Sequence, residues 1–178
     1  LAAKGKFSEA EVTEILIEIL KILELVHANN TIHRDIKPSN IMRNKQGVLY
    51  LLDFGAVKQI AVGGGNPKKS TGIFSMGFAP PEQMSGAQVY PSTDIYALAV
   101  TCLNLLPDKE VEELYDSFNH TWQWHSFVPN ISDRLKQILD RMLLPTPAHR
   151  FQSASVALAA LTVISKQINP VTTTKKPT

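Results

Sequence analysis

A short polar segment, residues 31–40, constrains this chain more than any other stretch. Its sequence is TIHRDIKPSN, which supplies a carboxylate (Asp35), an ammonium group (Lys37) and an amide (Asn40). A second carboxylate, Asp53, follows after a segment typical of a β-hairpin. Phosphoryl transfer requires a proton acceptor for the attacking hydroxyl, a cation beside the moving phosphoryl group and oxygen ligands for magnesium. These residue types therefore predict that the four side chains meet in one phosphoryl-transfer site.

A long amphipathic helix is predicted directly before this segment. Ser8 and Glu11 have the spacing of a capping box, in which each side chain bonds the backbone N–H of the other residue. The apolar residues that recur at helical spacing are Val12, Ile15, Leu16, Ile19, Leu23 and Val26. Asn29 and Asn30 can supply the left-handed residue that ends such a helix. We therefore expect the polar segment to begin where this helix ends.

The rest of the chain predicts one hairpin and further helices. Two short apolar runs, residues 41–43 and 48–52, flank a turn signal and predict the hairpin. Ser92, Thr93 and Asp94 precede an almost uniformly apolar helix. The helices expected in this part of the chain cover residues 95–106, 109–118, 132–144 and 153–164. The second of these is short and acidic, and the third is a capped amphipathic helix.

Two histidines, His120 and His125, lie among Trp122 and Trp124. This pattern admits a metal or partner site, but no third ligand lies nearby, so aromatic packing is the favoured interpretation. The one cysteine, Cys102, falls in an apolar helical pattern and is expected to be a buried reduced thiol. A single cysteine excludes an internal disulfide and suits a cytoplasmic location.

Composition narrows the classes of partner. With 44% apolar residues the chain can bury a sizeable core. A net charge of +2, without a basic stripe that includes aromatic residues, argues against nucleic acid. The longest apolar runs, residues 97–106 and 154–164, fall short of the roughly 18 residues that a membrane span needs. We therefore expect no membrane contact by this segment.

The motifs in and after the polar segment resemble those of protein kinases, of the serine/threonine type common in bacteria. Residues 33–40 match the H-R-D-x-x-x-x-N catalytic loop, and residues 53–55 match D-F-G. The residues that carry these two motifs are His33, Arg34, Asp35, Asn40, Asp53, Phe54 and Gly55. Pro81-Glu82, Asp94 and Arg150 continue the match in the family's order. The resemblance covers nearly the whole chain, but only the later part of a kinase domain.

This resemblance implies transfer of the γ-phosphate of ATP to a serine or threonine of a protein substrate. Asp35 would orient the substrate hydroxyl and accept its proton, and Lys37 would neutralise charge on the γ-phosphate. Asn40 and Asp53 would hold Mg²⁺. Ser75 would hydrogen-bond between Asp35 and Lys37 while it lines the substrate groove. The position of Lys37, two residues after Asp35, resembles serine/threonine rather than tyrosine kinases, and the implied cofactors are ATP and Mg²⁺.

Other matched residues have architectural roles by the same resemblance. Met42 would form part of the floor under the adenine ring, although a methionine that fills a gap in the core remains an equal alternative. His33 and Phe54 would stack in the apolar column that links the two lobes of a kinase. Asp94 would accept hydrogen bonds from the backbone of the catalytic loop.

Residues 53–82 match the activation segment of the family. Glu82 and Arg150 would form the buried ion pair that anchors its end. Arg34 would pair with a phosphate on Thr71, which lies where activating phosphorylation often falls. The alternative for Thr71 is a solvated hydroxyl in a polar loop.

The predicted fold is mainly α, a helical bundle with short β-hairpins that resembles the C-terminal lobe of a protein kinase. We expect residues 1–165 to form this lobe and residues 166–178 to form a polar tail. The sequence contains no G-x-G-x-x-G loop and no V-A-I-K lysine, which precede this region in the family. We therefore expect a missing N-terminal lobe upstream and an excerpt that is inactive alone. The alternative is a truncated kinase or pseudokinase that serves as a non-catalytic binding module.

Overall fold

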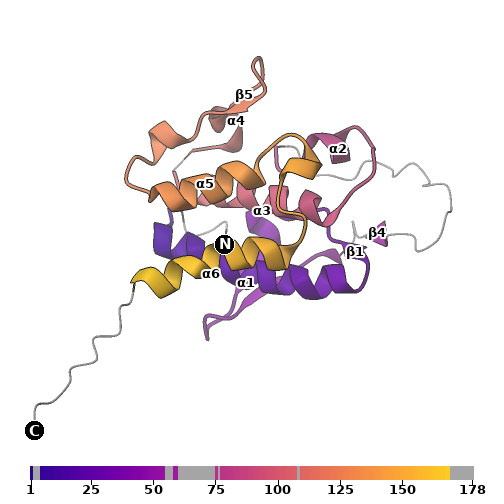
Figure 1. Cartoon of the computed structure of the whole chain (residues 1–178), viewed down its shortest axis with the longest axis horizontal. Helices are drawn as coiled ribbons and strands as arrows, with labels where there is room; N and C mark the ends of the chain where they lie inside the picture. The colour runs from indigo at the N-terminus through magenta and orange to yellow at the C-terminus, as the bar shows by residue number, and fades with distance from the viewer. Residues whose placement is uncertain (2–4, 55–57, 60–74, 76, 108, 169–178) are drawn as a thin grey trace, which may run out of the picture.

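The computed structural model describes residues 1, 5–54, 58–59, 75, 77–107 and 109–168. Within them helices predominate and the strands are short, which confirms the predicted mainly helical, C-lobe-like fold class. The long helices are α1 Glu9–Ala28, α3 Pro91–Leu105, α5 Asp133–Met142 and α6 Ala154–Ile168. Helices α1 and α6 lie side by side, and α3 and α5 pack above them in the view of Figure 1.

Helix α1 has the capping box that its sequence predicts. The Ser8 hydroxyl accepts the Glu11 N–H at 3.3 Å, and the Glu11 carboxylate accepts the Ser8 N–H at 2.9 Å. The apolar face of α1 is fully buried from Val12 to Leu23 and contacts α3 and α6, whereas Val26 is partly buried. At its C-terminus Asn30 has a φ of 53°, the left-handed conformation in which asparagine is tolerated. The chain then turns directly into strand β1, Thr31–Ile32.

Helix α3 begins earlier than the sequence predicts. We expected Ser92, Thr93 and Asp94 to precede the helix, whereas they form its first turn after Pro91. Proline suits this first position because its fixed φ is helical and its missing N–H would have no partner there. The Thr93 hydroxyl accepts the N–H of Tyr90 at 3.0 Å and so caps the turn. The helix is buried almost throughout, as its uniformly apolar sequence requires.

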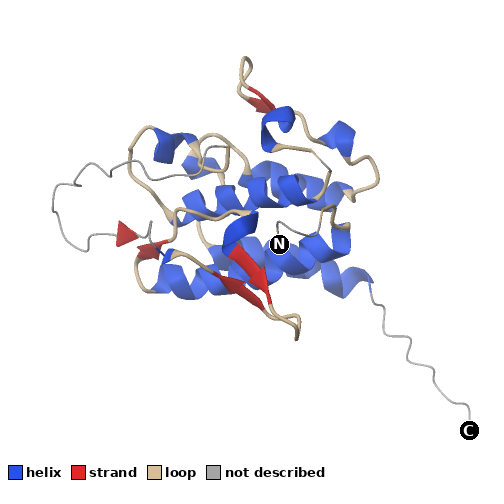
Figure 2. Ribbon diagram, turned by 180° about the vertical axis from the view of Figure 1, so that it is seen from behind, coloured by secondary structure: helices blue, strands red, loops and turns tan. Residues whose placement is uncertain are grey.

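Short antiparallel pairs connect and flank the helices. Strand β1 pairs with β4, Lys58–Gln59, and joins the end of α1 to the segment after Asp53. Strand β2, Ile41–Arg43, pairs with β3, Leu49–Leu51, as predicted, and this hairpin lies across one side of the helices in Figure 2. The single-turn 3-10 helix η1, Pro38–Asn40, precedes β2.

The predicted acidic helix over residues 109–118 is wrong in its second half. Helix α4 covers only Val111–Leu114, and the chain continues into a hairpin of β5, Tyr115–Asp116, and β6, Thr121–Trp122. The cause is local, because the Asp116 carboxylate accepts the N–H groups of Phe118 and Asn119 and so offers the backbone a turn instead of a helix. The hairpin projects from the body beyond α4 (Figure 1).

The tryptophans in and directly after this hairpin pack against neighbouring side chains. Trp122 contacts Tyr115, with ring centroids 4.9 Å apart, and Trp124 is buried with its indole N–H 3.0 Å from Asp140. No cluster of three metal-ligating side chains occurs among the described residues. The remaining short helices are α2 Pro81–Met84, η3 His125–Phe127 and η4 Pro147–His149.

Helices α5 and α6 match their predicted positions, with Ser132 as the N-cap of α5.

Cys102 is buried, and burial raises the pKa of its thiol well above the usual range, so the thiol form is favoured. Among the helices that the structure describes, none combines the length and apolarity that a bilayer crossing demands. Helix α6 runs to Ile168, and the division at residue 165 stays a prediction.

Candidate active site

The polar segment is fixed to the core by one buried carboxylate. Asp94, in the first turn of α3, accepts the backbone N–H of His33 at 2.9 Å and that of Arg34 at 2.8 Å. The ring Nε2 of His27, in the last turn of α1, lies 2.9 Å from the same carboxylate. Because Asp94 is fully buried, these bonds connect α1, α3 and the polar segment at one point.

Asp35, Lys37 and Ser75 form one hydrogen-bonded cluster. The Ser75 hydroxyl donates to Oδ1 of Asp35 at 2.7 Å and accepts from Nζ of Lys37 at 2.6 Å. Nζ of Lys37 also lies 3.1 Å from Oδ2 of Asp35. Nδ2 of Asn40 donates to the same Oδ2 at 2.8 Å and to the Asp35 carbonyl at 2.8 Å. Residues from two distant parts of the chain therefore converge on one carboxylate.

These contacts keep the Asp35 carboxyl ionised. Burial alone would raise the pKa of Asp35, but the hydrogen bonds from Ser75, Lys37 and Asn40 and the charge of Lys37 together hold it below its usual value. At neutral pH Asp35 is thus a carboxylate with oriented lone pairs. Such a group can accept a hydrogen bond, and then a proton, from a hydroxyl placed beside it.

Asp53 follows the hairpin and is tied to the same region through its neighbours. The N–H of Leu52 donates to the Asn40 carbonyl at 2.8 Å, and the His33 ring Nε2 lies 3.1 Å from the Leu52 carbonyl. On the other side, Phe54 contacts the His33 ring edge-on, with centroids 4.7 Å apart. Asp53 has a φ of 61° and is exposed. The hairpin thereby returns Asp53 to the vicinity of Asn40.

Glu82 and Arg150 form a buried bidentate ion pair. The Nη atoms of Arg150 lie 2.7 and 3.0 Å from the two carboxylate oxygens of Glu82. The Thr93 hydroxyl donates to Glu82 at 2.9 Å, and further Arg150 N–H groups bond three carbonyls, so both charges are well satisfied. The guanidinium group also lies over the ring of Tyr96, 4.7 Å from its centroid. This pair fixes the short helix α2 to α3 and the loop before α6.

Comparisons with known proteins identify the family of this chain. The family model described as "Protein kinase domain" matches residues 1–160. This chain belongs to the protein kinase family. The prediction of a bacterial-type serine/threonine kinase sequence is confirmed by its relatives. Members of the family generally use ATP and Mg²⁺.

Three of the relatives are curated cyanobacterial kinases. The chain is 58% identical to serine/threonine-protein kinase F of Synechocystis over 88% of its own length and 32% of that protein. It is 40% identical to serine/threonine-protein kinase PknA of Nostoc over 90% of its length and 29% of that protein. It is also 42% identical to serine/threonine-protein kinase B of Synechocystis, again over 29% of that protein. The kinase chain thus spans about a third of the length of these relatives.

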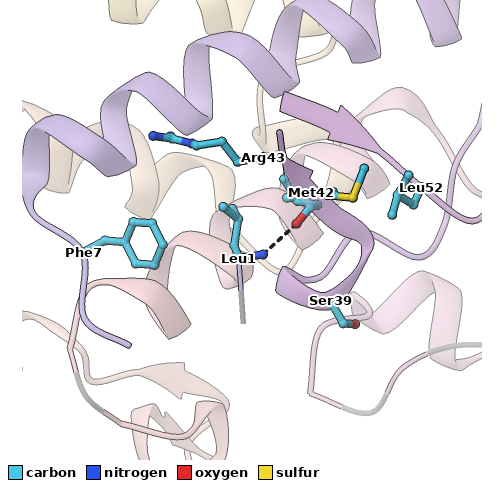
Figure 3. A pocket seen from close by; sticks show the side chains of 7 residues that line it. Leu1, Phe7, Ser39, Met42, Arg43 and Leu52 are labelled. Carbon is cyan, nitrogen blue, oxygen red and sulfur yellow. Dashed lines mark hydrogen bonds between the residues drawn. The ribbon is translucent and has the colours of Figure 1, made fainter. Parts of the chain in front are cut away.

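An apolar hollow lies beside the kinase motifs. It has a volume of about 480 Å³ and is lined by Leu1, Phe7, Ser39, Ile41, Met42, Arg43 and Leu52. Figure 3 shows Met42 and Leu52 on the hairpin, with the Leu1 nitrogen 2.7 Å from the Ile41 carbonyl. Met42 is 47% exposed, so it does not fill a gap in the core that the described residues form. Its place under an adenine ring stays a prediction.

Some of the predicted residues cannot be placed. Gly55 and Thr71 lie outside the described residues, so the D-F-G glycine and the pairing of Arg34 with a phosphate on Thr71 stay predictions. Conversely, two residues of the site were not found from the sequence. His27 contacts Asp94, and Nε2 of Gln83 donates to the Arg34 carbonyl at 2.7 Å. These two contacts join residues 67 and 49 positions apart, and the spacing of residues along a helix gives no information about such distant pairs.

Proposed function

We propose that this chain carries the catalytic loop of an ATP-dependent protein serine/threonine kinase. Asp35 orients the hydroxyl of a substrate serine or threonine and accepts its proton during transfer. Lys37 neutralises charge that develops on the γ-phosphate, and Ser75 holds Asp35 and Lys37 in register. Three neighbouring side chains would therefore accept the proton, balance the phosphate charge and hold the first two in place.

The observation that supports this proposal is the shared cluster around Asp35. A carboxylate is left ionised and partly accessible, with 11% of its side chain exposed, and an ammonium group lies 3.1 Å away. A purely structural ion pair would not need Ser75, which lies 40 positions after Asp35 in the chain. A substrate hydroxyl near Asp35 would also lie near the cation that faces the phosphate.

Asn40 and Asp53 fit a magnesium ion in their donor chemistry. Nδ2 of Asn40 is committed to Asp35, so its amide oxygen is the atom directed elsewhere. With the exposed Asp53 carboxylate it offers the hard oxygen ligands that Mg²⁺ prefers. One carboxylate and one amide are few ligands, which suits an ion that takes the rest from phosphates and water. When bound, Mg²⁺ would neutralise phosphate charge.

The test replaces Asp35 in the full-length protein. We expect Asp35→Asn to keep the hydrogen bond from Nδ2 of Asn40 to the backbone carbonyl of residue 35. It loses the carboxylate that accepts the proton, which lowers kcat by about 10²- to 10⁴-fold. Transfer of ³²P from ATP to a serine- and threonine-containing protein measures the rate. Asp133→Asn is the matched control, because that side chain is 94% exposed on α5. An Asp35→Asn variant as active as this control would refute the proposal.

We further propose that residues 1–178 alone do not transfer phosphate. The sequence lacks the glycine-rich loop and the V-A-I-K lysine, and loss of a single preorganised charge-stabilising group lowers rates by about 10²- to 10³-fold. Incubation of purified residues 1–178 with labelled ATP and a protein substrate tests this. Turnover at the rate of the full-length protein would contradict it.

A further inference from the structure

Gln83 is a buried amide that contacts the backbone of the catalytic loop. It lies in α2 and is 3% exposed. Its Nε2 donates to the carbonyl of Arg34 at 2.7 Å, across a buried interface between α2 and the loop. A carbonyl oxygen can only accept, so the NH₂ side of the amide must face it. Neither an ionised carboxylate nor an aliphatic side chain could make this bond.

The residue that Gln83 holds has an unusual backbone conformation. Arg34 has a φ of 71°, in the left-handed region that side chains rarely adopt. Its N–H donates to Oδ1 of Asp94 at 2.8 Å, and its carbonyl accepts from Gln83. Both peptide groups that flank the Arg34 Cα are therefore fixed by buried side chains. The second of these peptide groups leads directly into Asp35.

The neighbouring residue of α2 has a different partner. Glu82 is held by Arg150 and Thr93, which lie on the side of α3 and the last loop. Gln83 instead contacts the catalytic loop, so two consecutive residues tie α2 to two separate parts of the core. A shift of α2 would accordingly act on the Arg34 carbonyl through Gln83.

We propose that Gln83 is a positioning residue that fixes the peptide before Asp35 and so holds the Asp35 carboxylate in its cluster with Ser75 and Lys37. Its effect on rate rests on the proposed function, whereas its effect on the loop backbone does not. Small displacements of a reacting group can lower rates by about 10²-fold, which sets the scale of the expected effect.

The first variant is Gln83→Met in the full-length protein, because methionine has a similar length but no N–H donor. We expect kcat to fall by about 10- to 100-fold, with the KM for ATP changed by less than about threefold. Amide hydrogen exchange over residues 33–36 should become faster. Gln137→Met is the matched control, since Gln137 is exposed on α5.

The second variant, Gln83→Glu, should make kcat depend on pH through the hydrogen bond to the Arg34 carbonyl. A glutamate buried at this position has its pKa raised, and only its protonated form can donate to the Arg34 carbonyl. We therefore expect the ratio of its kcat to that of the wild type to rise as pH falls. For Gln83→Met this ratio should stay flat.

The proposal is overturned if Gln83→Met keeps the wild-type kcat, or if its kcat falls only with the folded fraction while exchange over residues 33–36 is unchanged. A flat pH ratio for Gln83→Glu, at a level equal to Gln83→Met, would also refute it. If the wild-type protein transfers no phosphate, the proposed function fails. Exchange in Gln83→Met then still decides the inference, because faster exchange supports it and unchanged exchange overturns it.

Discussion

Two aspartates of this chain accept several hydrogen bonds each, in opposite surroundings. Asp94 is fully buried and accepts the N–H groups of His33 and Arg34, which lie 61 and 60 positions before it. Asp116 lies in the projecting β5–β6 hairpin and accepts two N–H groups and two side-chain amides, all from residues at most 7 positions away. The chemistry of the acceptor is the same, and the sequence distance differs.

Burial decides what each carboxylate does. Without Asp94, two buried N–H groups would lose their partners where no water replaces them. Without Asp116, water can solvate the N–H groups of Phe118 and Asn119, since this hairpin is exposed and Phe118 is 91% exposed. One aspartate therefore fixes the tertiary position of the catalytic loop, whereas the other shapes a local turn.

The largest effect should come from the buried ion pair, in which an interior carboxylate has a charged partner. Arg150→Met leaves Glu82 as an uncompensated buried charge, and we expect the free energy of unfolding to fall by about 3 to 5 kcal/mol. Denaturant unfolding measures it. Arg134→Met, at an exposed site on α5, is the control. If Arg150→Met loses no more stability than Arg134→Met, burial does not distinguish interior from exposed charged side chains in this protein.

Asp94→Asn should have the next largest effect. Its amide keeps one oxygen acceptor but turns an NH₂ group toward a buried N–H, so we expect unfolding to become easier by about 2 to 3 kcal/mol. The same change at Asp116 is the matched control in denaturant unfolding. Equal losses in the two variants would break the comparison.

Asp35 lies between these extremes and tests the electrostatic part of the comparison. Ser75→Ala removes the hydrogen bond that most lowers the pKa of Asp35, so that pKa should rise. The ionised Asp35 carboxylate supports activity and stability at pH values above its pKa, and this support is lost as the pH falls through that pKa. With a higher pKa in Ser75→Ala, the loss on acidification should begin at a higher pH. The acid limb of the kcat/KM profile measures this. Ser155→Ala, exposed on α6, should leave the limb in place.

Asp116→Asn should have the smallest effect on global stability. Hydrogen bonds, first that from the Asn119 side chain, hold the pKa of Asp116 below its usual value. The turn is therefore stabilised at neutral pH and loosens only as pH falls through this lowered pKa. We expect Asp116→Asn to speed amide exchange at Phe118 and Asn119, with little change in Tm. A large drop in Tm would place the hairpin in the cooperative core.

The sequence predicted the features that depend on short spacing. The Ser8–Glu11 capping box, the β2–β3 hairpin and the kinase motifs each occupy a few consecutive residues. It failed where a nearby alternative competed, as at Asp116, whose side chain ends α4 in favour of a turn. At the start of α3 it favoured Ser92 to Asp94 over Pro91 as the boundary.

By itself, then, the sequence determined the existence of the long helices, the hairpin next to the polar segment and which side chains could carry out phosphoryl transfer. Only the tertiary structure decided that Ser75 meets Asp35 and Lys37, that His27 meets Asp94 and that Gln83 meets Arg34. The reason is that such contacts join residues 38 to 67 positions apart, and their strength comes from burial that only the packed helices create.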